Sequence, residues 1–103
     1  MDLTDLVHEL CKQMPKEERY SLTDQLNRCS ISIPSNIAEG SGKRTNKHFA
    51  EFLSTSFTSS FELETQLLIC ERRNYCDKDL RDKSLKEVVE IQKMIFSFRE
   101  GLN

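Results

Sequence analysis

A chain of 103 residues has room for one domain that folds alone, and we treat residues 1–103 as that single domain. With 37% hydrophobic and 31% charged residues but only three Gly and two Pro, its composition excludes a turn-rich β fold and indicates an all-α protein. The net charge of −2 excludes the strongly basic signature of an obligate nucleic-acid binder, so any basic function must be local.

The first ten residues, MDLTDLVHEL, contain acidic residues and no uninterrupted apolar run. We therefore expect neither a signal peptide nor a membrane-spanning helix, and a cytoplasmic protein without membrane contact. The four cysteines lie far apart without a C-x-x-C pair: Cys11, Cys29, Cys70 and Cys76. In a reducing compartment such residues are free thiols packed as small apolar groups, so we predict no disulfide framework and no zinc site.

Apolar residues at steps of three and four predict a first helix that starts at Leu3 and is ended by Pro15. A second helix is expected to start near Pro15, where proline fits a first helical turn, and to continue through Ile37. Pro34 lies inside this second apolar stripe, where it removes a backbone donor and crowds the carbonyl of Ser30. We expect a kink between Ser30 and Pro34.

Gly40 follows the last apolar position of the second helix, where a C-cap is expected. Thr45 or Asn46 can then cap a third helix, the longest, which we predict to end near Asn74. Two adjoining apolar stripes on this helix indicate that it touches more than one neighbour. The small residues at which another helix could approach closely are Ser56, Ser59 and Ser60.

A fourth segment begins after residues 75–77 and has the three-four alternation of left-handed bundle packing. Its inward positions are Ser84, Val88, Ile91, Ile95, Phe98 and Leu102. Four helices with short connections predict an all-α fold, an antiparallel up-down four-helix bundle.

The connection GSGKR, residues 40–44, invites comparison with a phosphate-binding loop. A Walker loop needs G-x-x-x-x-G-K-[ST] between a strand and a helix, whereas here a helix precedes the glycines and the spacing differs. The segment does lead into a helix N-terminus, which favours anions. Basic residues and a histidine gather there with no acid between Glu39 and Glu51: Lys43, Arg44, Lys47 and His48. They either bind sulfate or backbone phosphates or form a solvated, charged turn.

Side chains that could carry catalysis or bind a metal do not form a recognised pattern. Glu62 and Glu64, two residues apart on a helix, point to different sides. This favours structural hydrogen bonds, or salt bridges to Arg28 or to a neighbouring subunit. His8 and Cys11 share a helical face but lack a second pair of metal ligands. We therefore predict no catalytic residues, no metal and no cofactor.

The order of these segments is more specific than any one of them. Residues 22–75 resemble the four-helix bundle proteins encoded in intervening sequences of bacterial 23S ribosomal RNA genes, and their relatives, the accessory proteins of diversity-generating retroelements. The residues that carry the resemblance are Gln25, Leu26, Arg28, the run SIPSNIAEG (32–40), Arg44, Phe49, Phe52, Leu53 and the run ELETQL (62–67).

This resemblance implies a four-helix bundle that assembles into a homopentameric ring and has no known enzymatic activity. Relatives from retroelements are basic, bind nucleic acid and associate with a reverse transcriptase, whereas proteins from ribosomal RNA insertions have no settled role. The present chain departs from them in its short first helix and its acidic overall charge. Independently of the resemblance, the double apolar stripe of the third helix in so small a chain favours a homo-oligomer.

Two functions from different classes follow. In the first, an oligomer contacts RNA or DNA phosphates through Arg28, Lys43, Arg44 and Lys47. In the second, the protein is a structural adaptor that contacts no nucleic acid and binds a reverse transcriptase or another protein. Phosphate contacts release counterions, so salt-dependent RNA binding would distinguish the two.

Overall fold

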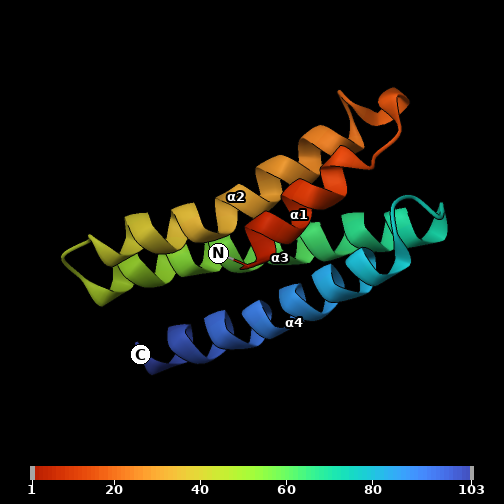
Figure 1. Cartoon of the computed structure of the whole chain (residues 1–103). Helices are drawn as coiled ribbons and strands as arrows, with labels where there is room; N and C mark the ends of the chain where they lie inside the picture. The colour runs from red at the N-terminus through yellow and green to blue at the C-terminus, as the bar shows by residue number, and fades with distance from the viewer. Residues whose placement is uncertain (1, 103) are drawn as a thin grey trace.

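The computed structural model describes residues 2–102, and four α-helices account for most of them. They are α1 (Asp2–Lys12), α2 (Leu22–Ser41), α3 (Asn46–Arg72) and α4 (Lys78–Gly101), with a short 3₁₀ helix, η1 (Lys16–Glu18), between the first two. Figure 1 shows successive helices running in opposite directions beside one another. The predicted all-α, antiparallel four-helix bundle is confirmed. No helix in the described part of the chain has the length and apolar character needed to cross a membrane.

The four helices surround a single core. α1 contacts α2 and α4, and α3 contacts the same two helices from the other side. α2 and α4 therefore lie diagonally opposite each other. The core is formed by apolar side chains from the inward face of every helix, including Leu3, Val7, Leu10, Leu26, Ile33, Leu53, Leu63, Leu67, Val88 and Ile95.

The short length of α1 decides which part of the bundle is covered. At 1.5 Å per residue, its 11 residues span about 17 Å, whereas the 27 residues of α3 span about 40 Å. The C-terminal end of α1 lies beside the start of α4, because the Asp77 N–H donates to Gln13 Oε1 at 2.7 Å. Figure 1 shows that α1 covers one half of the bundle and leaves α2, α3 and α4 uncovered by it in the other half.

The second helix begins later than predicted, at Leu22 rather than near Pro15. The carboxylate of Glu18 holds the intervening turn in place. Its partners are Ser21 Oγ at 2.7 Å, Tyr75 Oη at 3.0 Å and Arg73 Nη1 at 3.1 Å. These contacts, above all the hydrogen bond from Ser21, hold the pKa of the Glu18 carboxyl below its usual value. A turn anchored by these contacts replaces the expected first turns of the helix.

Gly40 is not the C-cap that its position in the sequence suggested. α2 continues through Gly40 to Ser41, and Gly42 follows as the cap. A Cβ atom at position 40 would lie 2.6 Å from Phe52 Cβ and 2.9 Å from Phe49 Cδ1. Glycine is needed at this position because α3 lies directly against the backbone of α2.

Pro34 lies within α2, and the helix continues through it. Figure 1 shows α2 changing direction near its middle, as expected where proline removes a backbone hydrogen bond. Side chains bind carbonyl groups beside the proline. Asn36 Nδ2 donates to the Ser32 carbonyl at 2.8 Å, and Ser56 Oγ of α3 donates to the Ile33 carbonyl at 2.9 Å. The second of these bonds ties the bend to the neighbouring helix.

The two predicted stripes of α3 differ in burial. The first is mostly buried, with Leu63, Leu67 and Cys70 in the core. In the second, Leu53 belongs to the core, whereas Phe57 is half-buried and Phe61 and Leu68 are exposed. The three serines predicted to allow close helix approach, Ser56, Ser59 and Ser60, are all buried. The outer part of α3 therefore leaves apolar surface in contact with solvent.

Candidate nucleic-acid interface

The connection between α2 and α3 is a short turn with a cap on each side. The Lys43 N–H donates to the Gly40 carbonyl at 3.0 Å, which closes the last turn of α2. Thr45 Oγ1 accepts the His48 N–H at 3.2 Å and caps α3, so of the two predicted caps, Thr45 and Asn46, it is Thr45 that is observed. These bonds fix the backbone from which the basic side chains project.

Three cations surround this turn, and we call them the basic turn: Lys43, Arg44 and Lys47. All three are exposed, and among residues 2–102 none forms an ion pair with a carboxylate. Lys43 Nζ lies 5.2 Å from the centroid of the Phe52 ring, a cation–π contact that holds it against α3. The first turn of α3 contains no acidic residue, so the positive end of the helix dipole adds to the cations. The result is a local positive surface on an acidic protein.

Arg28 lies outside the basic turn. It projects from α2 about 20 Å along the helix axis from the end of that helix. Its Nη2 pairs with Asp24 Oδ2 at 3.2 Å on the surface.

Glu64 accepts a hydrogen bond from Gln92 Nε2 of α4 at 2.9 Å. Of the roles predicted for Glu62 and Glu64, structural hydrogen bonding is the one observed for Glu64.

Arg28 lies in a polar groove between α2 and α3. The other residues that line it are Gln25, Cys29, Ser32, Ser59, Glu62 and Gln66. The helices are joined here by a 2.9 Å hydrogen bond between the Ser32 and Ser59 hydroxyls and by one from Gln66 Nε2 to Cys29 Sγ at 3.3 Å. Gln66 is buried, and within the described chain its Oε1 has no hydrogen-bond partner. Gln66 Oε1 is thus a buried hydrogen-bond acceptor at this groove that no other described residue satisfies.

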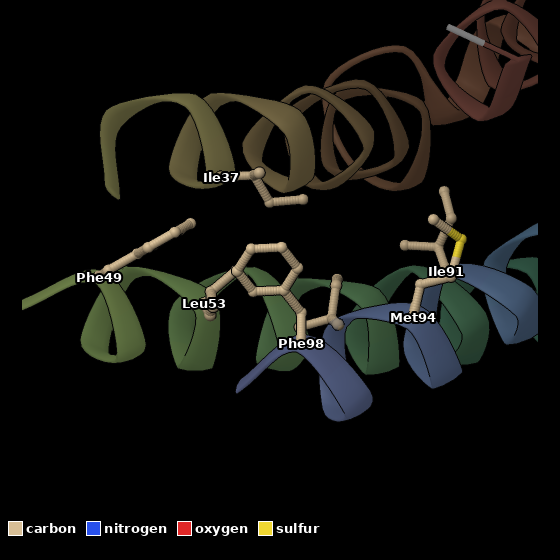
Figure 2. Close-up of a pocket in the computed structure, with 7 residues that line it drawn as sticks. Ile37, Phe49, Leu53, Ile91, Met94 and Phe98 are labelled. Carbon is tan, nitrogen blue, oxygen red and sulfur yellow. The ribbon is translucent and has the colours of Figure 1, made fainter. Parts of the chain in front are cut away.

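A second groove is apolar and lies in the half of the bundle that α1 does not reach. Its cavity of about 200 Å³ is lined by Ile37, Phe49, Leu53, Ile91, Met94, Ile95 and Phe98. Figure 2 shows these side chains between α2 and α4 and above α3. Met94 is 68% and Phe98 55% exposed. The expected burial of Phe98 in the α4 stripe is therefore wrong, because this side chain lies in the half of the bundle over which α1 does not extend.

Comparison with known proteins decides the family. A sequence profile of the 23S rRNA-intervening sequence protein family matches residues 1–97. The chain belongs to this family. A crystal structure of a protein of unknown function from the S23 ribosomal protein family of Bacteroides thetaiotaomicron is similar in fold, with a TM-score of 0.86 at 21% identity. The match covers 96% of the present chain and 89% of the other. Curated proteins give no significant match.

The fold of this 23S rRNA-intervening sequence protein explains where the residues of its motif lie. Those that line the polar groove are Gln25, Arg28, Ser32, Glu62 and Gln66. Gly40 and Phe52 make the close contact between α2 and α3, and Arg44 belongs to the basic turn. Most residues of the motif therefore lie where α2 packs on α3. Arg44, in the middle of the motif, is the one assigned to the basic turn.

Sulfur atoms gather at the end of the bundle opposite the basic turn, which the spacing of the cysteines did not predict. Met14 Sδ lies 3.4 Å from Cys76 Sγ and 3.9 Å from Cys70 Sγ. All four cysteines are free thiols. Burial, with a smaller effect of the neighbouring thiols, raises the pKa of Cys11 to about 12 and that of Cys70 to about 11. In the described residues, no three His, Cys, Asp or Glu side chains are placed to hold a metal.

Cys11 and Cys70 should consequently react slowly with a disulfide reagent such as DTNB. At pH 8 we expect rates at least about tenfold lower in the folded protein than in urea, because the thiolate is the reactive form. Above the ordinary thiol pKa of 9.0, the unfolded chain ionises while the folded thiols stay protonated, so stability should fall as pH rises towards 12. Equal rates in folded and unfolded protein would contradict the burial of these thiols.

Proposed function

We propose that this 23S rRNA-intervening sequence protein is a non-enzymatic, homo-oligomeric scaffold that binds RNA or DNA backbone phosphates through the basic turn. The observation that supports this most is the exposure of Lys43, Arg44 and Lys47 at the N-terminus of α3, without carboxylate partners among residues 2–102. Lysine, arginine and helix N-termini are the groups that contact phosphate oxygens. Such contacts carry no sequence information, so binding is expected to be independent of base sequence. We assign the protein to the cytoplasm, where its free thiols stay reduced.

Oligomerisation would strengthen a contact that is weak in one chain. Three cations neutralise few phosphates, whereas a ring of five chains would present five basic turns to one strand. The net charge of −2 per chain is multiplied in the same way and opposes the approach of a polyanion. Binding therefore requires that the attraction between the basic turns and the phosphates outweighs the repulsion from the net negative charge of the oligomer.

Arg28 belongs to this proposal as a separate, secondary phosphate contact. Its side chain is 76% exposed, but its pair with Asp24 must open before it can bind phosphate. An exposed pair of this kind contributes at most about 1 kcal/mol, so opening it is feasible. The cations of the basic turn need no such rearrangement.

Exposed apolar side chains on α3 and α4 support self-association. We call this surface the aromatic face: Phe57, Phe61, Leu68 and Phe96. Phe61 and Phe96 are each 47% exposed, and the rings of Phe57 and Phe61 meet edge to face at 4.8 Å between centroids. Apolar surface of this kind marks a contact with another protein surface. We propose that it is the contact between copies of the chain.

Light scattering at micromolar concentration should then give a mass several times the 12.0 kDa of one chain, and we propose that of five, the ring that the family resemblance implies. Phe61→Lys should lower this mass towards that of the monomer without loss of helicity, because the side chain lies outside the core. Tyr20→Lys is the control, since Tyr20 is exposed in the turn before α2. A monomeric parent protein would exclude the oligomer.

Titration with RNA of mixed sequence tests the phosphate contact. We expect the parent protein to bind at low salt and to lose affinity as salt rises, because each phosphate contact releases counterions. Strong preference for one sequence would contradict a contact made through phosphates alone. No binding at low salt would exclude the nucleic-acid function.

The apolar groove favours a second candidate function, a protein-interaction adaptor that contacts no nucleic acid. Met94 and Phe98 leave apolar surface in water at this groove, which costs free energy unless a partner covers it. A reverse transcriptase or another protein would be the partner in this case. Equal RNA binding, or none, by the parent protein and a variant without the basic turn would favour this function.

A further inference from the structure

We infer that Met14, Cys70 and Cys76 form a binding site for one soft monovalent metal ion, Cu(I), which their three sulfur atoms would hold together. We call these residues the sulfur cluster. The inference does not depend on RNA binding, because the cluster lies at the end of the bundle opposite the basic turn (Figure 1). The sequence predicted no metal, since Met14 is far along the chain from both cysteines. The inference departs from that prediction because the fold brings the three sulfurs together.

The sulfur cluster combines three separate segments of the chain. Met14 follows α1, Cys70 lies in the last turn of α3, and Cys76 lies in the connection to α4. Met14 Sδ is 3.4 Å from Cys76 Sγ and 3.9 Å from Cys70 Sγ. Metal–sulfur bonds of about 2.3 Å, the length found at zinc, place two ligand sulfurs roughly 4 Å apart. Each thiol therefore lies at about the distance from the thioether that a shared metal ion requires.

An ion can reach the sulfur cluster from solvent. Cys70 is buried in the core, whereas Met14 and Cys76 are only half-buried. The thiol of Cys76 donates to the Leu10 carbonyl at 3.3 Å, and the same carbonyl accepts the Gln13 N–H at 3.0 Å. If Cys76 gives up its proton to bind a metal, this carbonyl therefore keeps a hydrogen bond.

The backbone holds Cys76 in a conformation that residues other than glycine rarely adopt. Its φ is 67°, in the left-handed region, and that of Asn74 is 56°. The Tyr75 N–H donates to the Cys70 carbonyl at 2.8 Å, which ties this connection to the end of α3. Such backbone conformations persist where the surrounding structure fixes them, and they are frequent where ligands are held. The connection thus fixes the backbone of Cys76 relative to that of Cys70.

The ligand atoms select the kind of metal. Thiolate and thioether sulfurs favour soft ions, of which Cu(I) is the one that uses both. Structural zinc sites need four ligands. In the described part of the chain, no group of three His, Cys, Asp or Glu side chains is placed to hold a metal, so two thiols and a thioether are what this site offers. That set is short of a zinc site and sufficient for Cu(I).

A buried charge beside the sulfur cluster favours the same ion. Arg81 is 5% exposed, and among residues 2–102 it forms no ion pair with a carboxylate. Its Nη1 donates to Asn74 Oδ1 at 3.2 Å and to the Tyr75 carbonyl at 3.1 Å, whereas its Nε has no hydrogen-bond partner in the described chain. A buried cation without a counterion is costly. Cu(I) bound by two thiolates and a neutral thioether has a net charge of −1, which Arg81 would balance.

Binding exchanges two S–H bonds for two Cu–S bonds. The thiols of Cys70 and Cys76 release their protons to solvent, and the Met14 thioether donates a lone pair. Copper stays Cu(I), so no electron is transferred. Burial, with a smaller effect of Cys76, raises the pKa of Cys70 to about 11, and the protein without metal therefore holds this proton firmly. Coordination to a metal ion is strong enough to deprotonate a thiol.

Competition with bathocuproine disulfonate, a coloured chelator of Cu(I), tests the inference on the whole chain in the presence of ascorbate. We expect the parent protein to retain one Cu(I) per chain. Cys76→Ser and Met14→Leu should each bind at least about tenfold more weakly, since even groups that only support metal ligands contribute that much. Met14→Leu keeps the volume of the side chain and removes its sulfur. Cys29→Ser is the matched control, because Cys29 is also a half-buried free thiol but lies in the polar groove.

Circular dichroism checks that the variants remain helical. A higher melting temperature with Cu(I) for the parent protein, absent in Met14→Leu, would support the site, because an ion that binds the folded state stabilises it. Equal affinity of the parent protein and either Cys76→Ser or Met14→Leu would overturn the inference. So would a loss in Cys29→Ser as large as that in Cys76→Ser, which would indicate adventitious binding by any thiol. Zn²⁺ binding as tight as that of Cu(I) would overturn the choice of a soft monovalent ion.

Discussion

Gly40→Ala should destabilise the protein by about 2 kcal/mol, although alanine favours a helix by up to about 1 kcal/mol over glycine. The added Cβ would lie 2.6 Å from Phe52 Cβ and 2.9 Å from Phe49 Cδ1. The Cβ of Phe52 cannot move away without a shift of the α3 backbone. Overpacking of this kind costs about 1–3 kcal/mol, and here it should reach the upper end of that range. Urea denaturation measures the change as a lower midpoint at an unchanged slope.

Gly101→Ala is the matched control, because this glycine also lies in a helix but has no atom within 4 Å of the added Cβ. We expect it to be neutral or slightly stabilising. If Gly40→Ala were as stable as Gly101→Ala, the two helices would not approach each other as closely as the structure shows.

Replacing Lys43, Arg44 and Lys47 together by Gln should lower RNA affinity by about a hundredfold at low salt, because the lost contacts are repeated in every chain of an oligomer. Helicity and oligomer mass should remain unchanged. The three side chains are exposed and lie outside both the core and the aromatic face. Gel-shift titration gives the affinity, and light scattering gives the mass.

A matched triple variant separates the local surface from net charge. Lys16, Lys83 and Lys86 are exposed lysines far along the chain from the basic turn, and their replacement by Gln changes the net charge by the same amount. We expect this variant to bind RNA nearly as well as the parent protein. An equal loss of affinity in the two variants would mean that total charge, and not the basic turn, controls binding.

The helices could be predicted from the sequence because each has a regular apolar stripe and a clear terminal signal. Thr45 illustrates this, since a hydroxyl at that position caps α3 with a bond to the backbone only three residues away. The start of α2 could not be predicted in the same way. It depends on bonds from Tyr75 and Arg73 to Glu18, more than fifty residues apart in the chain. Long-range contacts of this kind leave no local pattern.

The candidate sites also divide into those that have a local sequence pattern and those that depend on contacts between distant parts of the chain. The basic turn could be found because its residues are adjacent in sequence, whereas Arg28 proved to lie about 20 Å away along α2. The role of Gly40 was misjudged because a glycine near a helix end has the same local pattern whether it caps the helix or admits a neighbouring one. The apolar groove was missed because side chains of three helices, α2, α3 and α4, line it, and such an arrangement leaves no local pattern.

The most direct test of the phosphate-binding function is the dependence of RNA affinity on salt for the parent protein and for the triple Gln variant of Lys43, Arg44 and Lys47. For single-stranded RNA, each cation that contacts a phosphate adds about 0.7 to the slope of log K against log salt. We therefore expect the slope of the variant to be shallower by about 2 for each basic turn that contacts the strand. Identical slopes for the two proteins, or no binding by the parent protein at the lowest salt, would contradict the account.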